Sequence, residues 1–283
     1  MISFVGSVFS PYYHWAGRRE PDDHVCINVA LYAPGGHRWT MTERGRKDLK
    51  RDALSFTVGP SQLRREGDDI VIDFDEISVP RPPSQWLPKR IKGSIRFTAD
   101  SVTSQVFDID GNGRHRWWPI SPTGRIRVDF ESGGEDWAGH GYMDSNWGTE
   151  PLEKGFAQWD WARGRLPGGD AVIVYDTVRT DGSLGAFALR IRPDGEIEQI
   201  SMPARTRLAN GFWGVPRAGH HDHGARPVLR QTLEDGPFYT RSVVRTRLLS
   251  ENIDMMYESL SGTRFASPIV KAMLPFRMPR RAG

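Results

Sequence analysis

The sequence has a single cysteine, Cys26, in 283 residues. One cysteine cannot form an intrachain disulfide, so a reducing compartment is natural for this chain. No apolar run approaches the ~18 residues that a membrane-spanning helix needs, and the first residues lack the basic flank and long apolar stretch of a signal peptide. We therefore expect a cytoplasmic protein, or one that lies peripherally on the cytoplasmic face of a membrane.

An excess of charge of one sign is also missing. The chain has 38 Lys and Arg against 35 Asp and Glu, a formal net charge of +3. This is far from the strongly basic surface of a nucleic-acid-binding domain, so we expect no nucleic acid partner. The run His220-His221-Asp222-His223 is the one histidine cluster, but neighbouring histidines in a Gly/Pro-rich loop rarely converge on one ion. With no phosphate-binding glycine motif either, we expect no cofactor and no metal.

Long helical periodicity is scarce, since 30 Gly and 20 Pro divide the chain into short pieces. The pieces between them alternate in polarity or are rich in β-branched residues, which is typical of strands. Asp-Gly pairs at 110–111, 181–182 and 194–195 predict tight hairpins. We expect short helices only at 42–52 and 267–274. The expected strands are 25–32, 54–58, 70–74, 91–97, 125–130, 171–177, 186–191 and 243–248.

These features predict an all-β protein built from sandwich or barrel units. Its length is generous for one domain, so we expect two, residues 1–150 and 151–283. Ten Trp residues are many for this length. They either fill the cores of the β-units or line an apolar cavity.

Two segments carry candidate chemistry. Residues 139–148 (GHGYMDSNWG) place His140, Tyr142 and Asp144 on one face if the segment is a strand, because alternate residues share a face. Residues 113–119 (GRHRWWP) do the same for His115 and Trp117. An acid, a phenol and an imidazole on one face of a strand could together line an active site. The alternatives are a polar strand facing solvent and a turn followed by a packed Trp.

The sequence resembles the acyclic carotenoid 1,2-hydratases, or hydroxyneurosporene synthases, of anoxygenic phototrophic bacteria. The similarity starts at residues 2–13 (ISFVGSVFSPYY) and continues through 26–32 and 39–45. It is most specific at 141–152 (GYMDSNWGTEPL) and 159–163 (WDWAR), and it is weakest in the last third of the chain.

The resemblance implies a fold of two lipocalin-like β-units with few short helices. It implies that the active-site residues are His115, Trp117, Tyr142 and Asp144. It also implies cofactor-independent hydration of the C1=C2 bond of neurosporene, lycopene and related pigments, with Asp144 as the acid. Such pigments belong to the spheroidene and spirilloxanthin pathways, so other carotenoid-pathway enzymes are candidate partners.

Two other functions stay open on the same residues. A proton-initiated cyclase would share the first carbocation, and a carotenoid-binding protein would return its pigment unchanged. The tail 267–281 mixes apolar residues with cations, which suits peripheral contact with an anionic membrane or simply a docked C-terminus.

Overall fold

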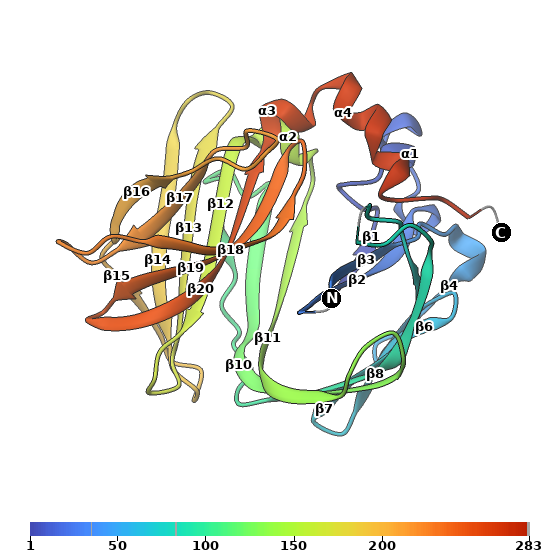
Figure 1. Cartoon of the computed structure of the whole chain (residues 1–283), viewed down its shortest axis with the longest axis horizontal. Helices are drawn as coiled ribbons and strands as arrows, with labels where there is room; N and C mark the ends of the chain where they lie inside the picture. Colours follow the sequence, from blue (N-terminus) through green and yellow to red (C-terminus); the bar gives the residue numbers. More distant parts are fainter. Residues whose placement is uncertain (35, 83, 282–283) are drawn as a thin grey trace. The chain divides into compact units, whose positions relative to one another are not determined.

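The computed structural model describes residues 1–34, 36–82 and 84–281, and strands make up most of it (Figure 1). The predicted all-β class with a few short helices is confirmed. No helix within these residues is long and apolar enough to cross a bilayer. The helices and 3₁₀ turns are α1 (Pro11–Trp15), η1 (Pro21–Asp23), η2 (Arg46–Asp48), α2 (Leu152–Gly155), α3 (Gly262–Phe265), α4 (Pro268–Met273) and η3 (Leu274–Phe276).

The chain folds into two compact units that each combine separate segments. Unit 1 contains residues 1–99, 125–141 and 271–283, and unit 2 contains 100–124 and 142–270. The long strands β10 (His115–Ser132) and β11 (Trp137–Gly148) therefore contribute residues to both units. The division into contiguous domains at residue 150 stays a prediction.

Unit 1 is built from antiparallel strands that follow one another along the chain. Its apolar core combines alternate residues of several of these strands, among them Ile27, Phe74, Ile91 and Val128. Alternation of this kind buries one face of each strand and leaves the other polar. The strands are β1 (Ile2–Val5), β2 (Val25–Ala33), β3 (Gly36–Met41), β4 (Leu49–Arg51), β5 (Ser55–Val58), β6 (Ser61–Glu66), β7 (Asp69–Ser78) and β8 (Lys89–Ala99).

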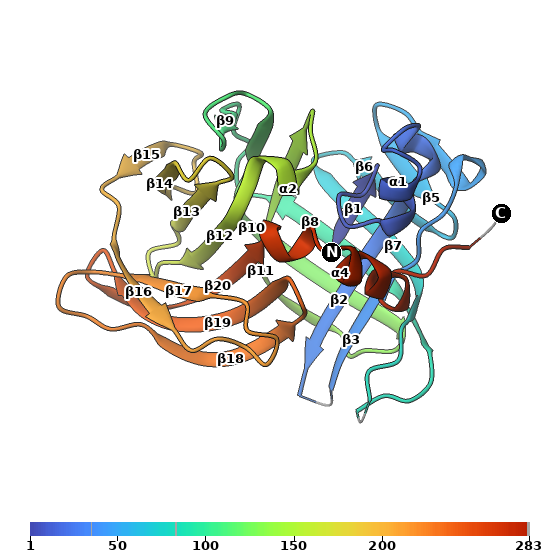
Figure 2. The same cartoon turned by 90° about the horizontal axis from the view of Figure 1, so that it is seen from above.

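Unit 2 is dominated by a seven-stranded sheet in the order β15-β14-β13-β12-β20-β19-β18 (Figure 2). One face of β12 and β13 packs into an apolar core that includes Ala162, Val174 and Tyr257, and the other face carries aromatic rings. Its strands are β9 (Phe107–Asp108), β12 (Phe156–Arg165), β13 (Ala171–Arg179), β14 (Leu184–Ile191), β15 (Ile197–Ile200), β16 (Ala204–Leu208), β17 (Arg217–His221), β18 (Val228–Asp235), β19 (Tyr239–Leu248) and β20 (Glu251–Ser261).

The predicted hairpins and one of the two predicted helices are confirmed. Gly111, Gly182 and Gly195 each take a positive φ in the turn between paired strands, where glycine has no steric penalty. The helix expected at 267–274 corresponds to α4 (Pro268–Met273).

The helix expected at 42–52 is wrong. Gly45 is extended there, and the segment forms only the short turn η2 and strand β4. The tertiary structure uses this segment differently, because Arg44 exchanges backbone hydrogen bonds with Val25 and sends its side chain into the interior.

Inside unit 1, Arg44 makes a buried bidentate ion pair. Its Nη1 and Nη2 atoms donate to Glu76 Oε1 and Oε2 at 3.0 and 2.9 Å. Ser61 donates a further hydrogen bond to Glu76 at 2.7 Å. A buried charge is tolerable only when it is paired and hydrogen-bonded in this way.

Replacing Glu76 by Gln should lower the free energy of unfolding of unit 1 by about 3–5 kcal/mol, because the guanidinium of Arg44 keeps its burial and loses its counter-charge. The neighbouring Asp75 pairs with Arg90, whose side chain is 61% exposed. Asp75→Asn is therefore the matched control, with a loss of about 1 kcal/mol or less. Urea unfolding followed by circular dichroism measures both, and equal losses would contradict the prediction.

Candidate active site

The centre of the site is a hydrogen bond between neighbouring strands of unit 2. The indole Nε1–H of Trp117 on β10 donates to Oδ2 of Asp144 on β11 at 2.9 Å. Indole nitrogen is only ever a donor, so the direction of this bond is fixed. The structure therefore brings together the acid and the Trp that the sequence singled out.

The carboxyl group of Asp144 is a weaker acid than an ordinary aspartate. Burial raises its pKa to about 6, while the Trp117 hydrogen bond opposes that rise. Glu258 on β20 raises the pKa further, and Arg163 on β12 lowers it. The residue as a whole is half-buried. Asp144 can thus hold a proton near neutral pH and present it to another molecule.

Aromatic rings surround Trp117, which is fully buried. Its ring lies 4.9 Å from Tyr175, 5.5 Å from Phe107 and 6.2 Å from Phe187, measured between centroids. Because neighbouring rings enclose the indole, its N–H edge is the part that reaches the acid. These rings fix the direction of the N–H bond and keep the surroundings of the carboxyl group apolar.

Tyr142 is two residues before Asp144 on the same face of β11, and 36% of its surface is exposed. One side of its ring lies 5.5 Å from the Trp161 ring, and the Arg163 guanidinium lies 4.6 Å from its centroid. Burial, with the nearby Asp144 as a second cause, raises the phenol pKa well above its usual value. Tyr142 is therefore a neutral phenol with an accessible ring beside the acid.

His115 lies apart from these three residues. It is buried at the start of β10, and its ring packs 4.9 Å from that of Phe156. Within the described part of the chain, no hydrogen bond or ring contact joins it to Asp144 or Tyr142. Burial lowers the imidazole pKa, which favours the neutral form.

The structure adds residues that sequence reasoning missed. Tyr175 donates its hydroxyl to Asn146 at 3.2 Å, two positions beyond Asp144 on β11. Arg163 donates to the Pro122 carbonyl at 2.7 Å, which anchors it next to Tyr142. The alternation of Trp159, Trp161 and Arg163 was a usable signal for one shared face. Glu258 comes from a strand that is distant in the sequence, and no sequence pattern indicated that it lies near the site.

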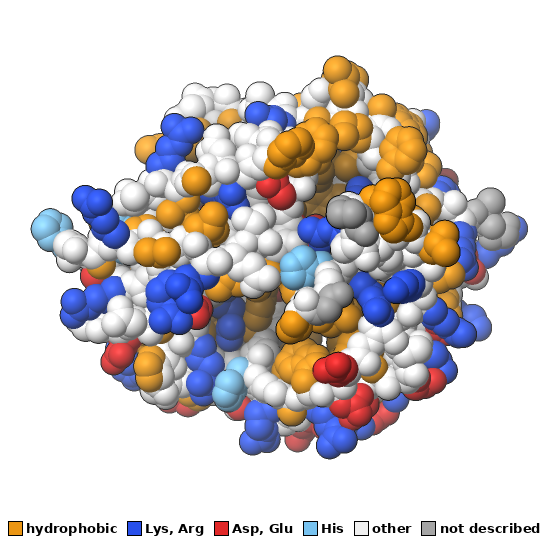
Figure 3. Space-filling model, viewed as in Figure 1, with side chains coloured by type: hydrophobic (Ala, Val, Ile, Leu, Met, Phe, Trp, Pro, Cys, Tyr) orange, Lys and Arg blue, Asp and Glu red, His pale blue; other side chains and the backbone are white. Residues whose placement is uncertain are grey.

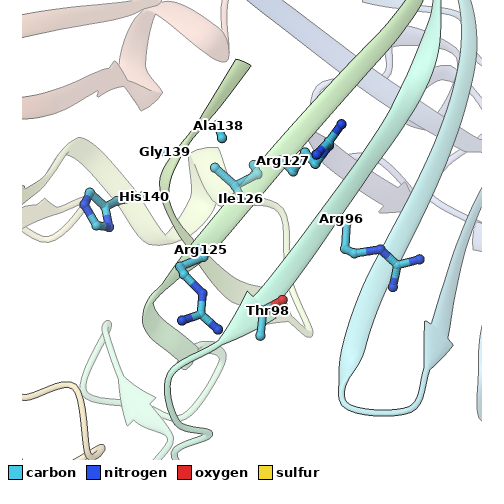
Figure 4. A pocket seen from close by; sticks show the side chains of 8 residues that line it. All are labelled: Arg96, Thr98, Arg125, Ile126, Arg127, Ala138, Gly139 and His140. Atoms are coloured by element: carbon cyan, nitrogen blue, oxygen red, sulfur yellow. The ribbon is translucent and has the colours of Figure 1, made fainter. Parts of the chain in front are cut away.

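His140, which the strand pattern placed on the face of Tyr142, belongs to unit 1. It borders an open hollow of that unit with arginines from β8 and β10 (Figure 4). Three arginines and a histidine are among its lining residues. The lining residues are Arg96, Thr98, Arg125, Ile126, Arg127, Ala138, Gly139 and His140.

The histidines of the 220–223 segment have separate surroundings. His221 contacts the Thr206 hydroxyl through Nε2 at 2.8 Å and its neighbour's carbonyl through Nδ1. His220 is buried and lies 3.4 Å from the Asp176 carboxylate, whereas His223 is exposed. The three rings thus point to different partners.

The sequence matches the family described as carotenoid hydratase CrtC over residues 1–283. It is 46% identical to an acyclic carotenoid 1,2-hydratase of Thiocapsa roseopersicina, with 100% of this chain and 69% of the relative covered. Another hydratase of that name, from Cereibacter sphaeroides, is 42% identical, with 100% and 99% covered.

Among solved structures, an AttH protein of Nitrosomonas europaea aligns with 84% of this chain and 80% of its own, with a TM-score of 0.52 and 14% identity. That likeness supports the fold alone.

Replacing Trp117 by Phe should raise the pKa of Asp144 above its value of about 6, because the N–H donor that stabilises the carboxylate is removed. Infrared titration of the carboxyl band, with carbon-13 aspartate labelling, measures the shift. Trp118→Phe is the control, since the Trp118 N–H donates to the Thr103 carbonyl instead. An unchanged or lowered pKa of Asp144 in Trp117→Phe would show that the indole N–H does not stabilise the carboxylate.

Proposed function

The chain belongs to the carotenoid hydratase CrtC family, and on that basis we propose that it adds water to the C1=C2 bond of acyclic carotenoids, with Asp144 as the proton donor. Neurosporene, lycopene and their derivatives are the proposed substrates. The observation that carries the proposal is the hydrogen bond from Trp117 to the carboxyl group of Asp144, whose pKa is about 6.

The first step is a proton transfer to an alkene. The protonated Asp144 accepts the Trp117 N–H on Oδ2, which leaves the other oxygen to hold the proton. The π electrons of C1=C2 form a new C–H bond at C2, and the O–H electron pair stays on the carboxylate. A tertiary cation results at C1, because alkyl groups stabilise positive charge there better than at C2.

The site accommodates both charges that this step creates. The Trp117 hydrogen bond becomes charge-assisted once Asp144 is an anion, and such bonds are about twice as strong as neutral ones. The accessible ring of Tyr142 offers its π face to the cation, an interaction worth ~2 kcal/mol in a desolvated setting. Arg163 also lies 4.6 Å from the centroid of that ring.

Water completes the reaction by attacking C1. Its oxygen supplies the electron pair of the new C–O bond, and one of its protons returns to the Asp144 carboxylate, directly or through a neighbouring hydroxyl. Tyr142 suits the second route, since its neutral phenol both donates and accepts a hydrogen bond. The addition of water leaves the overall oxidation state of the substrate unchanged, so the reaction needs no redox partner.

His115 enters this scheme as a positioning residue. It precedes Trp117 by two residues on β10, and its ring is held against Phe156. By fixing the start of β10, it fixes the direction from which the indole N–H approaches the acid.

We further propose that the protein takes its insoluble substrate from a membrane on whose cytoplasmic face it lies, alongside other enzymes of the carotenoid pathway. In unit 1 Trp15 is 57% and Phe276 is 82% exposed, each close in sequence to arginines. Figure 3 shows exposed hydrophobic side chains interspersed with Lys and Arg on one face. Aromatic residues beside cations suit the interface of an anionic bilayer.

Asp144→Asn should reduce hydration by at least ~10²-fold with the fold intact, because the amide cannot donate the required proton. Far-UV circular dichroism controls for folding. Asp129→Asn, which changes an exposed carboxylate of β10, should hydrate at the normal rate. Near-normal turnover by folded Asp144→Asn would contradict the assignment of the acid.

The pH profile gives an independent check on the same residue. The acid must carry its proton in the free enzyme, so kcat/KM should fall as pH rises above about 6, the pKa of Asp144. The measurement uses detergent-solubilised substrate at fixed detergent concentration. A profile that rises through this range would indicate a base in place of an acid.

The product identifies the reaction. In neurosporene and lycopene the C1=C2 bond is separated from the conjugated polyene by saturated carbons, so its hydration leaves the chromophore unchanged. With H₂¹⁸O, liquid chromatography and mass spectrometry should detect a more polar pigment that has gained one labelled water and kept its visible spectrum. Unchanged mass would identify a cyclase, and unchanged pigment a carrier.

A further inference from the structure

The turn between β9 and β10 has the sequence Asp108-Ile109-Asp110-Gly111-Asn112-Gly113, a pattern that matches the first half of a calcium-binding loop. Asp108 holds the turn together. Its Oδ1 accepts from the amides of Asp110 and Gly111, and its Oδ2 accepts from that of Gly113 at 2.8 Å. Both oxygens of Asp108 are thereby used, and Asp110 Oδ1 accepts from the amide of Asn112 at 3.1 Å.

Three side chains meet beside this turn. Asp110, His115 and Glu150 each offer one ligand atom, and these atoms lie within 4.8 Å of one another. His115 Nε2 is 3.7 Å from Glu150 Oε1. Two atoms bound to one ion at ~2.0–2.1 Å with a tetrahedral angle lie ~3.4 Å apart. The pair is thus too far apart for a good hydrogen bond and close to the separation that a shared ion requires.

The Nε2 atom of His115 is buried without a hydrogen-bond partner in the described part of the chain. The residue as a whole is 5% exposed. A Cβ built on Gly155 would lie 2.7 Å from Nε2 and 3.5 Å from Glu150 Oε1. Glycine at 155 therefore leaves open the space beside both ligand atoms. A buried polar atom that faces such a space calls for a ligand.

The charge around this space is negative. Asp108, Asp110 and Glu150 bring three carboxylates to one buried imidazole, and Arg114 pairs with Glu150 through its other oxygen, Oε2, at 3.1 Å. A cation would offset the remaining charge. Calcium and magnesium prefer oxygen ligands throughout, while imidazole combined with carboxylates suits first-row transition ions.

We propose that Asp110, His115 and Glu150 bind a divalent first-row transition ion, for which Zn²⁺ and Mn²⁺ are the probes. The ion joins the β9–β10 turn to the segment that follows β11. It thereby holds the start of β10, the strand that carries Trp117. Its role is structural, and no step of the proposed hydration passes through it.

The test uses untagged protein that has been stripped with chelator and desalted. Calorimetric titration with ZnCl₂ or MnCl₂ should give one equivalent bound and a higher melting temperature. Asp110→Asn and Glu150→Gln should each weaken binding by at least ~10-fold, the lower end of the cost of losing an outer-shell partner. Gly155→Ala should weaken it as well, because the added methyl group would lie 2.7 Å from His115 Nε2 and displace the imidazole.

Two control variants separate this site from others. Glu198→Gln removes an exposed carboxylate of unit 2, and His223→Ala removes an exposed histidine of the 220–223 segment. Both should bind as the unmodified protein does. In the unmodified protein, Co²⁺ should shift the ring signals of His115 in NMR spectra, which tests the ligand without any substitution.

Several outcomes would overturn the proposal. They are no binding of Zn²⁺ or Mn²⁺, binding lost only in His223→Ala, unshifted His115 signals with Co²⁺ bound, and tighter binding of Ca²⁺ than of either probe. The last would assign the turn as an all-oxygen site without His115.

Discussion

The hydrogen bond from the Trp117 indole to Asp144 is the interaction on which the rest of the site depends. It acts on both protonation states of the acid. While Asp144 is protonated, the bond occupies one oxygen and so fixes which oxygen carries the proton. After proton transfer, the same bond stabilises the anion. Burial alone would raise the pKa of Asp144 further, and the indole moderates that effect without adding a charge.

The sheet of unit 2 holds this hydrogen bond in place because its two faces carry different side chains, aromatic rings on one and aliphatic core residues on the other. One face of β13 supplies Tyr175 to the rings around Trp117, and the other supplies Val174 to the apolar core. The period of two along a strand gives both layers from one element. The indole is therefore held by packing that is continuous with the core, and its N–H has little freedom to turn away from the acid.

Sequence patterns predicted local features better than long-range ones. Alternation along 139–148 placed Tyr142 and Asp144 on one face, and alternation along 113–119 singled out Trp117. Neither pattern could indicate Glu258, which reaches the acid only through the order of strands in the sheet. The helix expected at 42–52 failed for a related reason, because burial of Arg44 against Glu76 outweighs local propensity there.

A second buried carboxyl group in unit 2 shows why burial alone does not make a catalytic acid. Asp160 is also buried and its pKa is also raised, with desolvation as the main cause. Its Oδ2 accepts from Arg205 at 3.2 Å, and the same arginine binds Asp176 at 2.6 Å. Asp160 is thus neutralised in place and closed to solvent. Asp144 has a neutral donor in place of an arginine, and as a residue it is half-buried where Asp160 is buried. The difference in partner and access, more than the shared raised pKa, separates a reactive acid from a structural one.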